Sequence, residues 1–348
     1  MRLTAAPIRV GVIGCGVIAY WVHLRLLRNF PGAKLVAASD PDAEARERAR
    51  RLVNIPIAAD SGDILGDANV DAVVICAPTN LHANLAIDAC NAGKHVFLEK
   101  PIAASADESA RVLDAAERSG VIATVGFNRR LHPMFEQARD MIASGRIGRV
   151  HAVQTAFCEP MDSAQMANWR KNRSTGGGAL LDLASHHIDL LRWFLSDEIE
   201  CVEATIESAQ TEHDSATLSL SLRRGARVQS FFSFRTARAD FLEFIGEKAT
   251  LRVDRHGSAL TTRVNRRFGY GIRNQATWPT TRVAAWRLQR LVQPSKEPSY
   301  RRTLTAFLDT IQGATPELAT FHDGARSLDV ILAAEESARL HAPVRIQT

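Results

Sequence analysis

An apolar strand followed by a glycine-rich turn opens the chain and constrains its fold more than any other feature. The strand is Ile8–Ile13, and GCGVIA at residues 14–19 follows it directly. Gly14 permits a tight turn, Gly16 lets a pyrophosphate approach the backbone, and Ala19 allows a helix to pack closely on the strand. A helix that begins there also presents free N–H groups and a positive dipole end to phosphates. The turn therefore predicts a dinucleotide-binding βαβ unit.

The next apolar strand, Lys34–Ser39, ends at an acidic residue. This residue is Asp40, which lies 21 positions after Ala19. An acid at this place accepts hydrogen bonds from both ribose hydroxyls of an adenosine. It would also repel a 2′-phosphate, and residues 41–44 contain no arginine to bind one. The sequence therefore favours NAD over NADP.

Strands and helices continue to alternate up to residue 126. The expected strands are Ile57–Ala59, Ala72–Ala77, Val96–Leu98 and Val121–Gly126, and the expected helices are Tyr20–Arg28, Ala43–Leu52, Leu81–Ala92 and Ser105–Ser119. This order predicts a doubly wound parallel sheet, and ligands bind such sheets beyond the carboxyl ends of the strands. Residues 78–80, 99–101 and 127–130 follow such ends.

Length and cysteine content set further limits. A chain of 348 residues is too long for one small core and predicts two domains, 1–127 and 128–348. The five cysteines form no CxxC pair, so we expect neither a zinc site nor a disulfide framework. No apolar run approaches the length of a membrane span, and the first one reads as a strand instead of a signal segment. These features favour a cytoplasmic protein.

Positive charge is concentrated in residues 263–302, which hold ten Arg and Lys against one acid. Elsewhere the chain has 33 basic and 37 acidic residues, so its net charge of +5 does not indicate a general nucleic-acid-binding protein. Thr281–Gln293 has the spacing of an amphipathic helix. Three interpretations of this basic insertion stay open: a solvated insertion or subunit contact, an anion site for a phosphorylated or nucleotide-linked sugar, and a helix on an anionic membrane.

The second half reads as a run of short strands closed by two helices. The expected strands are Arg149–Phe157, Cys201–Ile206, Ala216–Leu222, Val228–Phe234, Asp240–Ile245, Thr250–Val253 and Ser258–Val264, and the closing helices are Tyr300–Gln312 and Asp323–Leu340. Strands that follow a βαβ half in this way indicate a separate α+β domain.

A glycine triplet and a helical segment, GGGALLDLASHHIDLLRW, occupy residues 176–193. Apolar residues recur at helical spacing, whereas Asp182, His186 and Asp189 fall at i, i+4 and i+7 on another face. A carboxylate and an imidazole on one helical face can handle a proton, although a core helix with satisfied polar groups would show the same pattern. The three side chains can also bind zinc, but no further ligand cluster accompanies them, so we expect no metal. By helical phase, the neighbouring His187 should face the core.

Lys100 stands out because the chain has six lysines and 37 arginines. A partly buried lysine, unlike arginine, can lose its proton and serve as acid or base. The alternative is a surface charge or a phosphate contact. Lys94 is equally unusual, and we expect it to be structural.

Five motifs occur in order along the chain: GVIGCGVIA, APTNLH at 77–82, AGKHVFLEKP at 92–101, GFNRRLHP at 126–133 and GGGALLDLASHHID at 176–189. Over nearly the whole chain they resemble the glucose–fructose oxidoreductase, inositol dehydrogenase and rhizopine-catabolism (Gfo/Idh/MocA) family. The resemblance implies an α/β fold: an N-terminal Rossmann domain, and a C-terminal α+β domain whose large, mostly antiparallel open sheet commonly mediates oligomerisation. One departure is Ala184, where the family usually has glycine; the added methyl narrows backbone packing but removes no catalytic group.

The resemblance also implies roles for individual residues. The family's catalytic positions are matched by Lys100, Asp182 and His186. The resemblance implies that His186 acts as acid or base and that Lys100 polarises the substrate oxygen or shares the proton relay. It implies that Asp182 positions the sugar or orients the imidazole. Asn80, His82 and Glu99 match positions that line the nicotinamide ribose. The full set expected to bind the cofactor is Gly14, Gly16, Val17, Ile18, Asp40, Ala77, Pro78, Asn80, His82, Glu99, Lys100, Trp169 and Arg170.

These predictions amount to an NAD(H)-dependent oxidoreductase that acts on a hydroxyl or keto carbon of a sugar, inositol or sugar derivative. Two alternatives are an NAD-dependent glycosidase that uses transient oxidation, and a non-catalytic NAD-binding protein. The expected partner is a small sugar or polyol, either neutral or anionic. No nucleic acid is expected, and a membrane is disfavoured. The expected assembly is a homodimer or homotetramer.

Overall fold

The structure is a computed structural model that describes residues 6–256, 259–265, 272–276, 283–286, 288 and 297–346. The chain divides into two compact units. The N-terminal unit consists of Met1–Phe127 and Tyr300–Arg326, and the C-terminal unit of Asn128–Ser299 and Ser327–Thr348.

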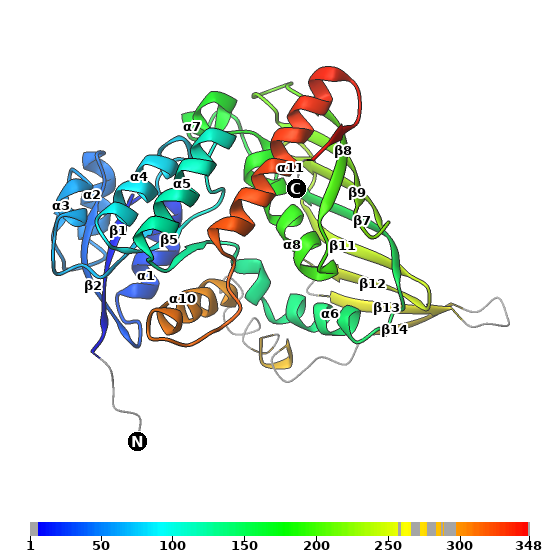
Figure 1. Ribbon diagram of the computed structural model, residues 1–348, viewed down its shortest axis with the longest axis horizontal. Helices are drawn as coiled ribbons and strands as arrows, with labels where there is room; N and C mark the ends of the chain where they lie inside the picture. The colour runs from blue at the N-terminus through cyan, green and yellow to red at the C-terminus, as the bar shows by residue number, and fades with distance from the viewer. Residues whose placement is uncertain are drawn as a thin grey trace. The chain divides into compact units, whose positions relative to one another are not determined.

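A six-stranded parallel sheet forms the centre of the N-terminal unit, in the order β3-β2-β1-β4-β5-β6 (Figure 1). Its strands are β1 (Ile8–Ile13), β2 (Ala33–Ser39), β3 (Ile57–Ala58), β4 (Ala72–Ile75), β5 (His95–Leu98) and β6 (Ala123–Val125). This is the predicted doubly wound sheet. Its strand order reverses between β1 and β4, and ligands bind such sheets at this switch point.

Helices connect these strands: η1 (Ala19–His23), α1 (Leu24–Leu27), α2 (Ala43–Arg50), α3 (Gly62–Leu65), α4 (Thr79–Asn91) and α5 (Ala106–Ser119). Local sequence explains several of their ends. The Asp42 carboxylate caps α2 by accepting from the N–H groups of Glu44 and Ala45, and Ser105 caps α5. Gly120 ends α5 in the left-handed conformation. The expected helix after the glycine turn differs in type, because η1 is a π-helix and only α1 is α-helical.

The N-terminal unit is not contiguous in sequence, which differs from a simple division at residue 127. Tyr300–Arg326 belongs to it. The reason is the apolar side of α10 (Pro298–Ile311), whose Leu304, Phe307 and Leu308 lie in the core formed by β1 and its neighbours. Phe307 packs edge-on against Phe97 of β5, with ring centroids 5.7 Å apart.

A large sheet dominates the C-terminal unit, with nine described strands in the order β14-β13-β12-β11-β7-β10-β9-β8-β15. They are β7 (Val150–Cys158), β8 (Ile199–Glu207), β9 (Ser215–Leu222), β10 (Arg227–Ser233), β11 (Ala239–Gly246), β12 (Ala249–Asp254), β13 (Ala259–Asn265), β14 (Ile272–Ala276) and β15 (Val344–Arg345). The pair β7–β10 is parallel and the other pairs are antiparallel. This confirms the predicted α+β architecture with a mostly antiparallel open sheet.

One face of this sheet carries the core of the C-terminal unit. Helices α6 (Pro133–Ala143) and α8 (Ser185–Leu195) pack against each other beside the strands (Figure 1). Burial alternates along β10 and β12, as expected for strands with one buried face. Phe194 of α8 joins the layers, since its ring meets Phe135 of α6 at 6.1 Å and Phe244 of β11 at 5.0 Å.

Much of the basic insertion, including most of the expected helix Thr281–Gln293, lies outside the described residues. The described parts add β14 to the sheet and bury Val283 and Trp286. None of the helices within the described residues is long and apolar enough to cross a membrane.

Candidate active site

The glycine turn after β1 has the geometry that its sequence predicts. Gly14 has φ of +91°, and its N–H donates to the Ser39 carbonyl oxygen at 2.8 Å. A Cβ on Gly14 would lie 2.8 Å from backbone atoms of Cys76, so a larger residue does not fit. A Cβ on Gly16 would meet nothing within 4 Å, so this side of the turn is open for a phosphate. Val17 and Ile18 continue the turn, and Val17 is 79% exposed.

The carboxylate of Asp40 is fixed beside this turn. Its Oδ2 accepts from the Cys15 N–H at 2.7 Å, and its Oδ1 accepts from the Asp42 N–H at 2.8 Å. A carboxylate has about four acceptor positions, so ribose hydroxyls can still bind it. Arg46 donates to the carbonyl oxygens of Asp40 and Pro41, both at 2.8 Å. Arg46 belongs to the helix after the loop, so the residues directly after Asp40 in sequence gave no sign of this guanidinium.

The loop after β4 carries Ala77, Pro78 and Asn80, and Asn80 is exposed in the first turn of α4. The buried His82 ties this loop to the next one. Its Nδ1 lies 2.6 Å from the Pro101 carbonyl oxygen and its Nε2 lies 2.9 Å from that of Ala77. Burial lowers the pKa of His82, while the two carbonyls act in the opposite direction. Because both ring nitrogens face main-chain oxygens, His82 holds the loops in place and has no ring nitrogen left for a ligand.

Glu99 and Lys100 follow β5. Glu99 is buried, and its Oε1 lies 2.7 Å from Nε2 of His23, the last residue of η1. This contact links the helix of the glycine turn to the loop that carries Lys100, which is half-buried. Lys94 has a different environment, because its ammonium donates to the carbonyl oxygens of Asp67 and Val70 at 2.8 and 2.9 Å. The structural role predicted for Lys94 is confirmed.

In the C-terminal unit close packing requires the glycine triplet. A Cβ on Gly177 would lie 2.3 Å from the carbonyl oxygen of Arg170. Gly176 and Gly178 have φ of +87° and +100°. The triplet therefore packs against the short helix α7 (Asn168–Lys171), which carries Trp169 and Arg170.

This packing places Arg170 beside Asp182. Their side chains form an ion pair, with Nη2 and Oδ2 2.9 Å apart, and the guanidinium lies over the ring of Trp169 at 5.4 Å. Asp182 belongs to a π-helical turn, η4 (Leu180–Ala184), that precedes α8. The expected α-helical spacing from residue 180 onward is therefore wrong at its start, and π-helical turns are frequent at functional sites.

His186 is the exception in a buried segment. Throughout the described stretch Gly176–Phe194, every residue except His186 is buried. Its ring lies beside Phe157 of β7, with centroids 6.2 Å apart. The helix thus leaves one imidazole partly exposed and buries its other polar side chains.

The two other polar residues of α8 are structural. His187 is buried, with Nδ1 3.1 Å from Thr155 Oγ1 and Nε2 3.1 Å from Asp240 Oδ1, which confirms the prediction that it faces the core. Asp189 forms a buried two-bond ion pair with Arg130, at 3.0 and 2.5 Å. Asp189 is thus held by Arg130, whereas Asp182 is held by Arg170.

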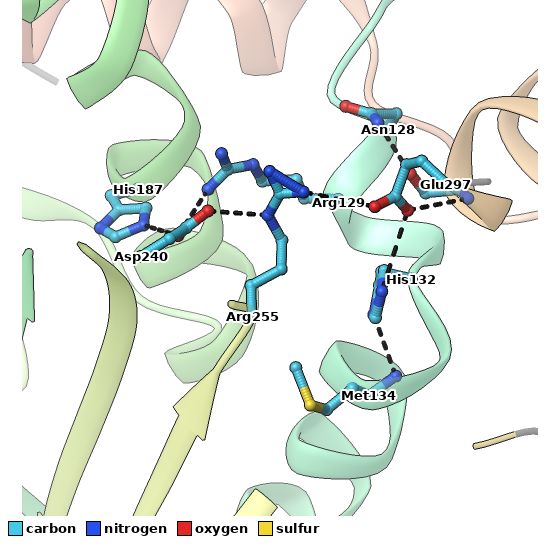
Figure 2. Close-up of polar contacts among 9 residues, drawn as sticks. Asn128, Arg129, His132, Met134, His187, Asp240, Arg255 and Glu297 are labelled. Carbon is cyan, nitrogen blue, oxygen red and sulfur yellow. Dashed lines mark hydrogen bonds and ion pairs between the residues drawn. The ribbon is translucent and has the colours of Figure 1, made fainter. Parts of the chain in front are cut away.

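A buried charge cluster behind the helix was missed by sequence reasoning. Figure 2 shows Asp240 between His187 on one side and Arg129 and Arg255 on the other. Arg129 reaches Asp240 Oδ1 at 3.0 Å and Arg255 reaches Oδ2 at 2.7 Å. Burial raises the pKa of Asp240, but the two guanidinium groups and His187 outweigh it and hold that pKa well below its usual range. Arg129 also lies over the Phe157 ring at 4.1 Å, so the cluster supports the side chain against which His186 packs.

The cluster continues to the start of α6. Arg255 Nη1 lies 3.3 Å from Glu297 Oε2, and His132 Nε2 lies 3.8 Å from Glu297 Oε1 (Figure 2). His132 caps α6, since its Nδ1 accepts from the Met134 N–H at 3.2 Å. Burial lowers the pKa of His132 to about 4, which keeps this ring neutral and able to accept. The adjacent arginines of GFNRRLHP were the available signal for this cluster, but their acidic partners are far away in sequence.

Comparison with known proteins agrees with this arrangement. The family model described as oxidoreductase family, NAD-binding Rossmann fold, matches residues 8–127, and the GFO/IDH/MocA C-terminal domain model matches residues 135–252. Inositol 2-dehydrogenase 3 of Saccharopolyspora erythraea is 32% identical over 71% of this chain and 73% of its own length. The chain belongs to the Gfo/Idh/MocA oxidoreductase family. Its N-terminal unit is an NAD-binding Rossmann domain.

Other relatives match over shorter stretches or in fold. The scyllo-inositol 2-dehydrogenase (NAD(+)) of Bacillus subtilis is 33% identical over 56% of this chain. The chain spans little more than half the length of several such curated relatives, 55%, 56% and 57% in three cases. The WlbA dehydrogenase structure from Bordetella pertussis superposes with a TM-score of 0.86 over 99% of both chains at 24% identity, which shows the shared fold.

Proposed function

We propose that the protein is an NAD(H)-dependent oxidoreductase that transfers hydride between the nicotinamide and a hydroxyl or keto carbon of a sugar, inositol or sugar derivative. Family membership and relatives named as inositol dehydrogenases support the reaction class. The observation that carries the proposal is the burial pattern of residues 176–194, where His186 is the one partly exposed member of an otherwise buried segment.

The residues around the glycine turn fit NAD. Gly16 leaves open space for the pyrophosphate, and the anchored Asp40 carboxylate has acceptor positions left for two ribose hydroxyls. The same carboxylate would repel a 2′-phosphate, which supports NAD over NADP. Bound NAD accepts or supplies the hydride in this class of reaction. The remaining proposed contacts come from Val17, Ile18, Ala77, Pro78, Asn80, Glu99 and Lys100, with Trp169 and Arg170 at the nicotinamide end.

Three side chains handle the proton and the substrate oxygen in this proposal. During oxidation His186 takes the proton of the reacting hydroxyl, and during reduction it returns that proton. Lys100 polarises the same oxygen or shares the proton relay. Asp182 positions the sugar, and its ion pair with Arg170 fixes the carboxylate in one orientation.

The C-terminal unit binds the substrate and forms the homo-oligomer in this proposal. Phe231 and Ile245 are exposed on the sheet face that α6 and α8 leave uncovered, which supports subunit contact there. All five cysteines are free, which supports a reducing, cytoplasmic compartment.

A substrate screen tests the proposal. Inositols, hexoses, aminosugars and nucleotide sugars are each incubated with NAD⁺, and NADH is followed by absorbance. We expect NADH to accumulate with at least one polyhydroxylated compound. Release of free sugar from a glycoside without net NADH would indicate the glycosidase alternative, and NAD binding without turnover across the whole panel would indicate a binding protein.

A further inference from the structure

A surface cavity of about 500 Å³ lies within the C-terminal unit, next to the helix that carries Arg170. It is lined by Ser163, Ala164, Lys171, Asn172, Gln210, Thr211 and Glu212. Its volume falls in the range of roughly 300–1,000 Å³ typical of small-molecule sites. None of the residues assigned above to the proposed reaction lines it.

The walls of the cavity are held by specific hydrogen bonds. The buried carboxylate of Asp214 accepts from the N–H groups of Ala209, Gln210 and Thr211 at 3.2, 2.6 and 3.1 Å. The Glu212 N–H donates to the carbonyl oxygen of Lys171 at 3.0 Å, which joins this turn to α7. His213 adopts φ of +53°, a conformation uncommon for residues other than glycine. The cavity is therefore preformed, and a ligand does not have to order it.

The lining determines which ligand chemistry fits. It combines hydroxyl, amide, ammonium and carboxylate groups and contains no apolar side chain larger than that of Ala164. The side chains of Ser163 and Gln210 line the cavity and can hydrogen-bond to ligand hydroxyls. The single cation, Lys171, is balanced by Glu212. The nearby Arg170 and Arg173 are already paired with Asp182 and Glu335. A neutral, hydroxyl-rich ligand fits this lining better than a diphosphate or an apolar group.

We propose that this cavity binds a second sugar unit of the substrate, one that does not react. Lys171 directly follows Arg170, which holds Asp182. The Ala179 N–H donates to the His213 carbonyl oxygen at 2.7 Å, which joins the turn that lines the cavity to the segment that carries Asp182. The inference rests on the proposed function and narrows its substrate class to carbohydrates of two units, such as a disaccharide or an inositol glycoside.

Binding without NAD tests the cavity independently of turnover. Cellobiose, maltose and galactinol are titrated into the full-length protein by calorimetry, with glucose and myo-inositol as the one-unit comparisons. We expect at least one two-unit compound to bind more tightly than its one-unit comparison. Gln210→Leu and Lys171→Met should weaken that binding by about tenfold each, because each removes a hydrogen-bonding group. Lys248→Met, an exposed change outside the cavity, is the matched control, and thermal melting checks that all variants fold.

Two results would overturn the inference: no two-unit compound binds more tightly than its comparison, or the cavity variants bind it as well as the control does. Failure of the proposed function would look different, because two-unit binding would then be intact while no compound yields NADH.

Discussion

Replacing Asp240 with asparagine removes one negative charge from the buried cluster and leaves the side-chain shape nearly unchanged. Asp240 is fully buried and pairs with Arg129, whose side chain is 8% exposed, and with Arg255. Removing one partner of a buried ion pair costs about 3–5 kcal/mol, because it leaves an uncompensated charge. For a unit of this size each kcal/mol lowers the melting temperature by about 2–4 °C. Asp240→Asn should therefore melt about 6–20 °C below the wild type.

The pH dependence of this difference follows from the lowered pKa of Asp240. A carboxyl group whose folded pKa is depressed contributes stability above its unfolded pKa, near 3.9, and loses that contribution as the pH falls through its folded value. The gap between wild type and Asp240→Asn should thus stay constant from pH 5 to 8 and shrink in stronger acid.

Calorimetric melting of the wild type, Asp240→Asn and Glu247→Gln measures these effects. Glu247 forms an exposed pair with His151, so Glu247→Gln should change stability by less than about 1 kcal/mol. We take the scatter of such scans as about 2 °C. If the melting temperatures of Asp240→Asn and Glu247→Gln differ by less than this, the charges of the buried cluster do not stabilise the fold as proposed.

Three further changes test other parts of the structure. Gly177→Ala forces a methyl against the carbonyl of Arg170 and should cost about 1–3 kcal/mol in chemical denaturation, whereas an unchanged midpoint would show that the turn relaxes freely. Asp40→Ser should weaken NAD binding about 10- to 100-fold relative to NADP in fluorescence titrations, and undiminished NAD selectivity would contradict the role given to this carboxylate. The pKa of His132 is about 4 when folded, so the wild type should lose up to roughly 3 kcal/mol as the pH falls from 6.5 to 4. His132→Asn keeps a capping oxygen for the Met134 N–H and should remove that loss, which urea titrations across this pH range would show.

Local sequence was sufficient to predict most of the fold. The alternation of apolar strands and helices predicted the parallel sheet, and period-two patterns predicted seven of the nine described strands of the C-terminal sheet, all but β14 and β15. The return of Tyr300–Arg326 to the N-terminal unit was not predictable in this way, because it depends on where α10 buries Leu304 and Phe307. The two-residue strand β15 was also missed, since it is defined by pairing with β8 and has no pattern of its own.

Within the site, sequence identified the side chains but not their partners. The pattern around Asp182 and His186 was treated as one α-helix, and a π-helical turn changes the spacing at its start. Asp189 matched the same face by spacing, yet its partner Arg130 is 59 residues away. Asp240 and Arg129 are 111 residues apart, and no local signal relates them. Pairings of this kind are determined by tertiary packing.

The central claim concerns Lys100 and His186, and turnover of their variants tests it most directly. With a substrate found by the screen, kcat is measured for Lys100→Met and His186→Ala beside Lys248→Met and His151→Ala, two changes at exposed positions. NAD affinity and melting temperature are measured for each variant to confirm that the fold and the cofactor site are intact. We expect kcat to fall about 10²- to 10⁴-fold in the first pair and to stay within about twofold in the second. Turnover of Lys100→Met and His186→Ala at the rate of the controls would contradict the proposed site.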